Sequence, residues 1–148
     1  MQNDLDKIYR TMLIVWVGIT MGLAGLFVFS TFAAPEPSTE PTTMPSGVVL
    51  FVLAALATFI MVLSFAVKRK ILQRSVEKQD VMLVQQAMVV ACAMCELGAL
   101  FGVVERFVIG SGEHYLLFLI SAVGMALHFP RRDQVLAASW NEQSRRSL

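Results

Sequence analysis

The sequence predicts an all-α membrane protein with four antiparallel transmembrane helices and both termini on the cytoplasmic side. Hydrophobic residues make up 56% of the 148 residues and gather in four apolar runs, whereas soluble domains are typically about 45–50% apolar. Eleven of the twelve Lys and Arg residues lie in the N-terminal segment, the connection between the second and third runs, or the tail after the fourth. Because Lys and Arg near span ends stay on the cytoplasmic side, this alternation indicates an even number of spans.

The first apolar run covers residues 12–34, which is long enough for a hydrocarbon core of about 30 Å. It exceeds the roughly 7–15 apolar residues of a secretory signal, so we expect an uncleaved span. Residues 35–45 follow and contain four of the five prolines. This composition predicts an extended, polyproline-like outer loop.

The second run, residues 47–67, ends at three successive cations, Lys68, Arg69 and Lys70. Leu72 keeps helical spacing beyond them, so the helix should continue past the bilayer or lie along its surface. Asp80 is a candidate N-cap for the third run, residues 81–109. A Gly-Ser-Gly segment at 110–112 then predicts a tight outer turn.

The fourth run covers residues 115–130, and residues 131–148 form a cytoplasmic tail within the same single domain. Trp140 in the tail suits a short helix at headgroup level. We expect His128 to be a solvated anchor at the inner interface, beside Arg131 and Arg132. The basic inner face should contact anionic lipid headgroups and not nucleic acid, because span orientation already explains its cations.

Two ridges of small residues predict helix contacts, because membrane helices associate where small side chains permit close approach. The spacing does not distinguish contacts within one chain from contacts between copies. The first ridge lies on the first run and the second on the third run: Gly18, Gly22, Gly25; Ala91, Cys95, Gly98, Gly102.

Glu96 is the sharpest functional candidate, because its position in the third run places a carboxyl near the bilayer midplane. An ionised carboxylate there costs at least several kcal/mol, so Glu96 should be protonated, paired or facing water. Cys92 shares its helix face, and depth places Thr58 and Ser121 in the same layer. Three roles remain open: a neutral carboxyl bonded within the chain, a site carrying a proton or cation, or a polar contact to another subunit.

Residues 93–104, Ala-Met-Cys-Glu-Leu-Gly-Ala-Leu-Phe-Gly-Val-Val, resemble the ion-binding helix of the rotor-ring subunit c of rotary ATP synthases. The resemblance implies a protonatable Glu96. It covers about a dozen residues, and the preceding run lacks the alternating glycines of that family. The whole chain is also similar to small uncharacterised bacterial inner-membrane proteins with a glycine turn and a last span ending in Pro-Arg. That similarity implies a four-helix fold in the bacterial cytoplasmic membrane.

An outer polar cluster should form from Glu105 and Arg106 with Glu113 and His114 across the turn, most simply as a structural clamp. The chain contains no Ser/His/Asp set, phosphate-binding loop, zinc-ligand helix or dinucleotide fingerprint. We therefore expect no enzyme activity, no cofactor and no metal. The leading hypothesis is a non-catalytic membrane subunit that packs in a larger complex or a homo-oligomer. The alternative is a proton- or ion-handling protein that uses Glu96.

Overall fold

The computed structural model describes residues 2–33, 46–110 and 112–146, and all regular secondary structure within them is helical. This confirms the all-α class. The predicted proline-rich loop and the central residue of the glycine turn lie outside the described residues. The elements in chain order are α1 (Gln2–Ala33), α2 (Ser46–Lys78), α3 (Val81–Val104), the π-helical turn η1 (Glu105–Ile109), α4 (Tyr115–Leu127) and α5 (Arg132–Arg146).

Three helical segments are long and apolar enough to cross a membrane: Leu5–Ala33, Gly47–Lys78 and Val81–Ile109. This finding fits a membrane protein. The fourth apolar run differs from the expectation, because α4 has 13 residues and ends at Leu127, not at Pro130. Pro130 has no amide donor and disfavours helical geometry in the residue before it, so the helix ends short of the proline.

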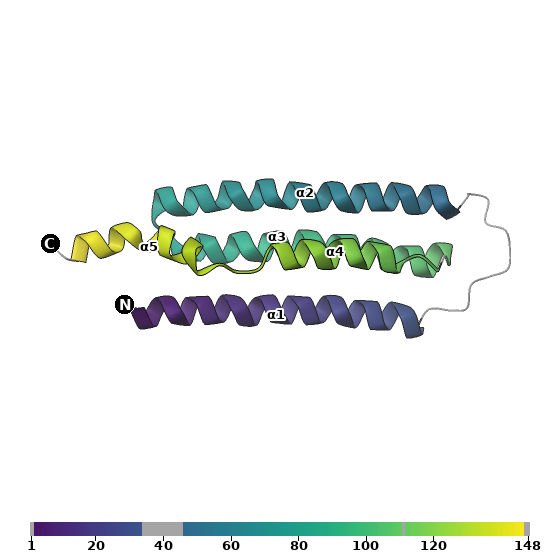
Figure 1. Cartoon of the computed structure of the whole chain (residues 1–148), viewed down its shortest axis with the longest axis horizontal. Coiled ribbons are helices and arrows are strands. Elements are labelled where there is room, and N and C mark those ends of the chain that lie inside the picture. The colour runs from purple at the N-terminus through teal and green to yellow at the C-terminus, as the bar shows by residue number, and fades with distance from the viewer. Residues whose placement is uncertain (1, 34–45, 111, 147–148) are drawn as a thin grey trace.

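The helices lie side by side along one axis, with α3 and α4 in the middle and α1 and α2 on opposite sides of them (Figure 1). The N-terminal end of α1 and the helix α5 lie at the same end of this bundle. In the most apolar stretch of α3, 44% of the residues are buried, against 11% in α1 and 17% in α2. The third helix is therefore the centre of the fold, and the outer two present most of their apolar surface outward.

The connection between α2 and α3 is short because the chain reverses within two residues. The helix α2 continues beyond the basic residues to Lys78, and Gln79 then takes a positive φ of 52°. The carboxylate of Asp80 accepts a hydrogen bond from the amide of Met82 at 2.9 Å, which confirms Asp80 as the N-cap. This tight turn sets α2 and α3 as an antiparallel pair.

The C-terminal end of the third helix changes from α to π geometry at Glu105. Gly110 closes this turn with φ 71°, and its amide donates to the carbonyl of Glu105 at 3.1 Å. A left-handed conformation of this kind is readily available to glycine. The wider turn leaves the side chain of Glu105 fully buried.

The main core lies toward the end of the bundle that carries α5. Met88 and Cys92 of α3 pack there with Met12 of α1, Met125 of α4 and Val135 of α5. Flexible methionine side chains fill irregular gaps between packed helices. The tail helix is thus part of the packed structure.

Candidate functional site

The small ridge of α3 packs against α4 within the chain. A Cβ placed on Gly98 would lie 2.6 Å from Oγ of Ser121, and one placed on Gly102 would lie 2.8 Å from the ring of Phe118. The contact is reciprocal, because a Cβ on Gly124 of α4 would lie 2.8 Å from Sγ of Cys95. The two helix backbones therefore approach closely only because these positions lack side chains. The remaining ridge residue, Ala91, is also buried.

The glycine ridge of α1 is exposed and is not packed against α4. A Cβ at Gly18 or Gly25 would meet nothing within 4 Å, and both residues are exposed. On the same side of α1, Ile14 is 72% and Met21 is 69% exposed. Large and small side chains therefore alternate along a helix face that contacts no other described part of the chain.

Glu96 lies at the edge of this α1 face. Its Oε1 is 3.5 Å from the position that a Cβ on Gly22 would occupy, so the carboxyl rests against the glycine backbone of α1. The residue is partly exposed. Within the described residues, its carboxyl makes no hydrogen bond to a protein group. A Cβ at position 22 would be in ordinary van der Waals contact with the carboxyl.

The polar residues expected in the same layer do not bond to Glu96 in the described part of the chain. The hydroxyl of Thr58 donates to the carbonyl of Ala54 at 2.8 Å and is exposed on α2. The hydroxyl of Ser121 donates to the carbonyl of Leu117 at 3.0 Å. Cys92, one turn from Glu96, is buried in the main core. Because each hydroxyl proton is used within its own helix, neither Thr58 nor Ser121 donates to the carboxyl.

The outer polar cluster gathers at the far end of the bundle. Glu105 is fully buried and lies close enough to Arg106 and Glu113 for their charges to interact. His114 is 8% exposed and stacks on the ring of Phe27 at a centroid distance of 6.3 Å. The turn therefore holds its charged groups against the ends of α1 and α3, an arrangement that suits a clamp.

His128 is not the solvated residue that the sequence predicts, because its side chain is fully buried. Its Nε2 lies 2.7 Å from Oγ of Ser64, and its ring packs on Phe65 at a centroid distance of 4.4 Å. The hydroxyl of Ser64 already donates to the carbonyl of Met61 at 2.6 Å. Nε2 is therefore the donor to Ser64. In the sequence, the only indication of this contact is Ser64, which lies one helical turn before Lys68.

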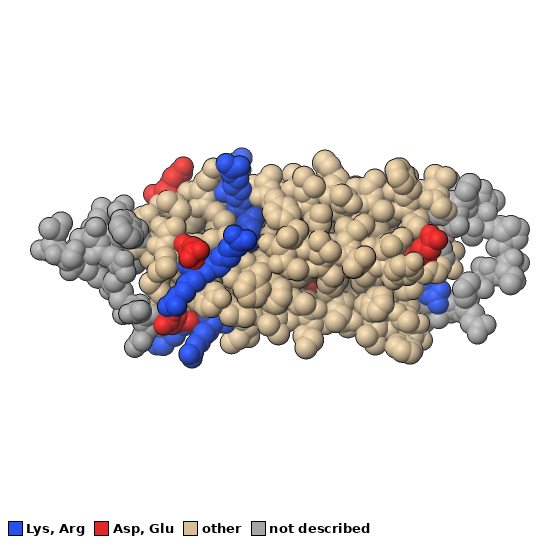
Figure 2. All heavy atoms as spheres, in the orientation of Figure 1, with Lys and Arg blue, Asp and Glu red and all other residues tan. Residues whose placement is uncertain are grey.

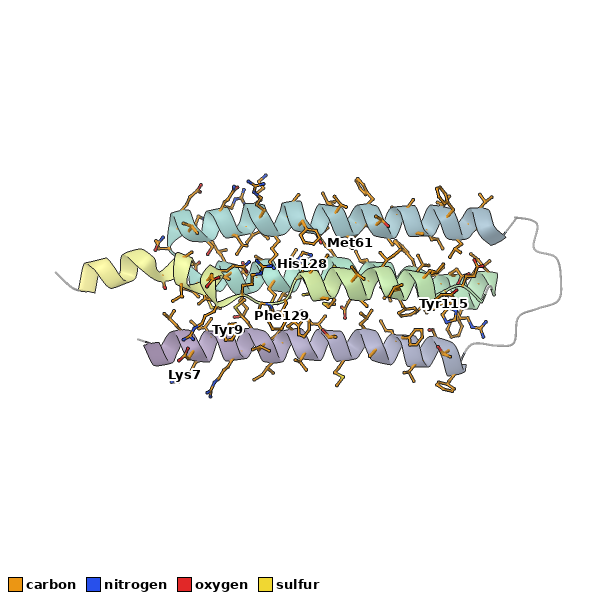
Figure 3. All side chains as sticks on the ribbon, in the orientation of Figure 1. Lys7, Tyr9, Met61, Tyr115, His128 and Phe129 are labelled. Atoms are coloured by element: carbon orange, nitrogen blue, oxygen red, sulfur yellow. The ribbon has the colours of Figure 1, made fainter. Side chains whose placement is uncertain are left out.

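The C-terminal end of α4 contacts α2 on one side and α1 on the other. His128 faces α2, whereas Phe129 packs edge-on against Trp16 of α1 at a centroid distance of 5.1 Å (Figure 3). The indole Nε1 of Trp16 also donates to the carbonyl of Met125 at 3.1 Å. These contacts fix the point where the chain leaves α4, which lies between the two outer helices.

Most of the Lys and Arg side chains in view lie at the end of the bundle that carries α5, and a largely uncharged band covers its middle (Figure 2). Lys68 is only 8% exposed, and its Nζ donates to the carbonyl of His128 at 3.5 Å. Arg132 forms an ion pair with Asp6 and joins α5 to α1. The remaining basic positions predicted for this face are exposed: Arg69, Lys70, Arg131.

Within the described residues, no group of three or more His, Cys, Asp or Glu side chains could hold a metal ion. Both cysteines are buried free thiols. Comparisons with protein-family models, curated proteins and solved structures found no match to this chain.

Proposed function

We propose that the protein is a non-catalytic subunit of the bacterial cytoplasmic membrane that packs in a larger complex or a homo-oligomer. It would cross the bilayer four times with both termini inside. The distribution of basic residues supports this orientation. The shortness of α4 is compatible with it, because 13 residues span about 20 Å and the non-helical residues that follow add to this length.

Non-helical backbone is tolerated at membrane depth only where its polar groups are satisfied. That condition is met after α4. The amide of His128 donates to the carbonyl of Gly124, and the amide of Phe129 donates to that of Ala126. The carbonyl of His128 accepts from Lys68. Pro130 has no amide to satisfy, so this segment can complete a fourth crossing.

The observation that carries the proposal is the carboxyl of Glu96 at the edge of the open α1 face. A partly exposed carboxyl at mid-bilayer depth needs hydrogen bonds, and lipid tails cannot provide them. The adjoining face of α1 alternates bulky Ile14 and Met21 with open Gly18 and Gly25. A transmembrane helix of another subunit or another copy would cover the open α1 face and satisfy the carboxyl, because it can pack into the glycine positions and present a polar group to Glu96.

The substitution of Gly18 and Gly25 by leucine tests this interface. Nothing in the described chain lies within 4 Å of either added Cβ, so the protomer should fold normally. The added side chains should block the approach of another helix. The matched control is Gly47→Leu, where a Cβ also meets open space but at the start of α2.

Native mass spectrometry of protein extracted gently from its own membranes is the measurement. We expect the wild type and Gly47→Leu to carry additional membrane subunits or further copies of the chain, and the double variant to release them. A wild-type protein that is a stable monomer in mild detergent and in native membranes would refute the proposal. So would an assembly that the double variant retains in full.

A second candidate function is proton or ion handling by Glu96, which its partial exposure favours over a sealed structural role. Carbodiimides react with protonated, accessible carboxyls in apolar surroundings. We expect labelling of Glu96 that falls as pH rises, with Glu96→Gln as the control. The absence of pH-dependent labelling at this residue would contradict the candidate.

A further inference from the structure

A groove opens on the surface between α2 and the corner where α4 leads into α5. It has a volume of about 870 Å³. The apolar side chains of Phe65 and Leu127 line it on the side of the membrane-crossing stretch. Lys68, Arg69 and Arg131 line it next to them. The groove therefore joins an apolar wall to a cationic one.

The cations of this groove lack an anionic partner in the described part of the chain. Neither Lys68, Arg69 nor Arg131 makes an ion pair there. Lys68 and Arg131 lie close enough for their positive charges to repel. The one carboxylate lining the groove belongs to Glu77. Glu77 is eight residues from Arg69 on α2, about 12 Å along the helix. The groove thus has an excess of positive charge that an anion would neutralise.

The depth of the groove matches a headgroup layer. Lys68 follows Gly47, the first apolar residue of α2, by about 21 residues, which corresponds to about 32 Å of helix. This distance is the thickness of a hydrocarbon core. The cations therefore lie where the hydrocarbon ends, and Phe65 and Leu127 lie just inside it.

We propose that this groove binds an anionic glycerophospholipid, with its phosphate between Lys68, Arg69 and Arg131. Basic pockets between helices at the cytoplasmic surface commonly hold such headgroups. An acyl chain would run along Phe65 and Leu127 into the hydrocarbon. This apolar continuation favours a lipid over a soluble phosphate, which would leave that wall exposed. The lipid would act on the inner surface, independently of the open α1 face.

The test uses the full-length protein in non-ionic detergent, where no charged membrane surface contributes. Phosphatidylglycerol is titrated and its retention is measured by native mass spectrometry, with phosphatidylcholine of the same chain length for comparison. The test variant is Arg69→Gln with Arg131→Gln, which spares the buried Lys68. The matched control is Lys70→Gln with Arg74→Gln, which removes two exposed cations outside the groove.

We expect the wild type and the control to prefer phosphatidylglycerol. The groove variant should bind it about 30-fold more weakly, the factor expected for two interfacial cations. Equal weakening in both variants would overturn the proposal in favour of general surface charge. If the wild type retained phosphatidylcholine as well as phosphatidylglycerol, the groove would bind lipids without selecting for charge, and the proposal would be overturned. Displacement by inorganic phosphate at concentrations similar to those of the lipid would show that a soluble anion is the ligand. Circular dichroism of both variants confirms that each is folded.

Discussion

The contact between α3 and α4 can be tested by a double-mutant cycle at Gly98 and Ser121. The substitution Gly98→Ala places a Cβ 2.6 Å from Oγ of Ser121, a distance that real side chains do not tolerate. Overpacking of this kind costs about 1–3 kcal/mol. The higher helix propensity of alanine returns about 1 kcal/mol. We therefore expect Gly98→Ala to destabilise the protein by a net of about 1 kcal/mol.

The second substitution, Ser121→Ala, removes the clashing oxygen. Its hydroxyl bonds only the carbonyl of Leu117 in its own helix, so its loss alone should cost well under about 1 kcal/mol. In the double variant, the new Cβ on residue 98 would lie 3.9 Å from the Cβ of residue 121 and 3.4 Å from that of Ala57. Both distances allow van der Waals contact, so the double variant should recover about 2 kcal/mol relative to the sum of the single effects.

The assay is equilibrium unfolding in mixed micelles, with helix content followed by circular dichroism and all four proteins measured under one set of conditions. Gly47→Ala serves as the matched control, because its Cβ meets nothing within 4 Å and should not destabilise the chain. The reasoning would be refuted if the single effects added without coupling. That result would mean that α3 and α4 do not pack closely at these two positions.

Three further predictions concern single polar contacts, each measured by the same unfolding assay. Asp80→Ala removes the N-cap of α3 and should cost about 1 kcal/mol, and an unchanged midpoint would show that the cap is unimportant. Trp16→Phe loses the donor to the carbonyl of Met125 and should cost about 1 kcal/mol, an expectation that fails if the variant is as stable as wild type. Ser64→Ala leaves the buried Nε2 of His128 without its partner and should cost about 1–3 kcal/mol, whereas Ser64→Thr, which keeps the hydroxyl, should retain more stability. If Ser64→Ala and Ser64→Thr lowered the free energy of unfolding equally, the loss would be due to changed packing and not to the missing hydrogen bond.

The regular elements were predictable from local sequence signals. Asp80 was identifiable as a cap because its side chain type and position before an apolar run suffice for that role. The apolar run predicts an end of α4 three residues beyond the observed one, because hydropathy continues through Phe129 while the effect of Pro130 on backbone geometry extends to the residues before it. The sequence predicts a solvated His128, and this prediction is wrong because the burial of its ring depends on Ser64, which lies far away in the sequence.

The candidate sites were also only partly predictable from local sequence signals. The α3 ridge with Gly98 and Gly102 and the α1 ridge with Gly18, Gly22 and Gly25 both have helical spacing in the sequence. Only Gly98 and Gly102 pack closely against a neighbouring helix, whereas Gly18 and Gly25 face open space. Glu96 could be placed near mid-bilayer depth by counting residues along its helix. Its position against Gly22 required the rotation of α3 relative to α1, which no local signal specifies.

By itself, the sequence determined that the chain is helical and apolar, where its long helices lie, and which residues are unusual at bilayer depth. Those properties depend on composition, on hydrophobic run length and on the local chemistry of caps and prolines. Only the tertiary structure decided which helix faces meet, that His128 is buried against Ser64, and that Lys68 and Arg131 share one groove. The physical reason is that backbone hydrogen bonds form within each helix, whereas the rotation of one helix about another is set by side-chain packing between distant segments.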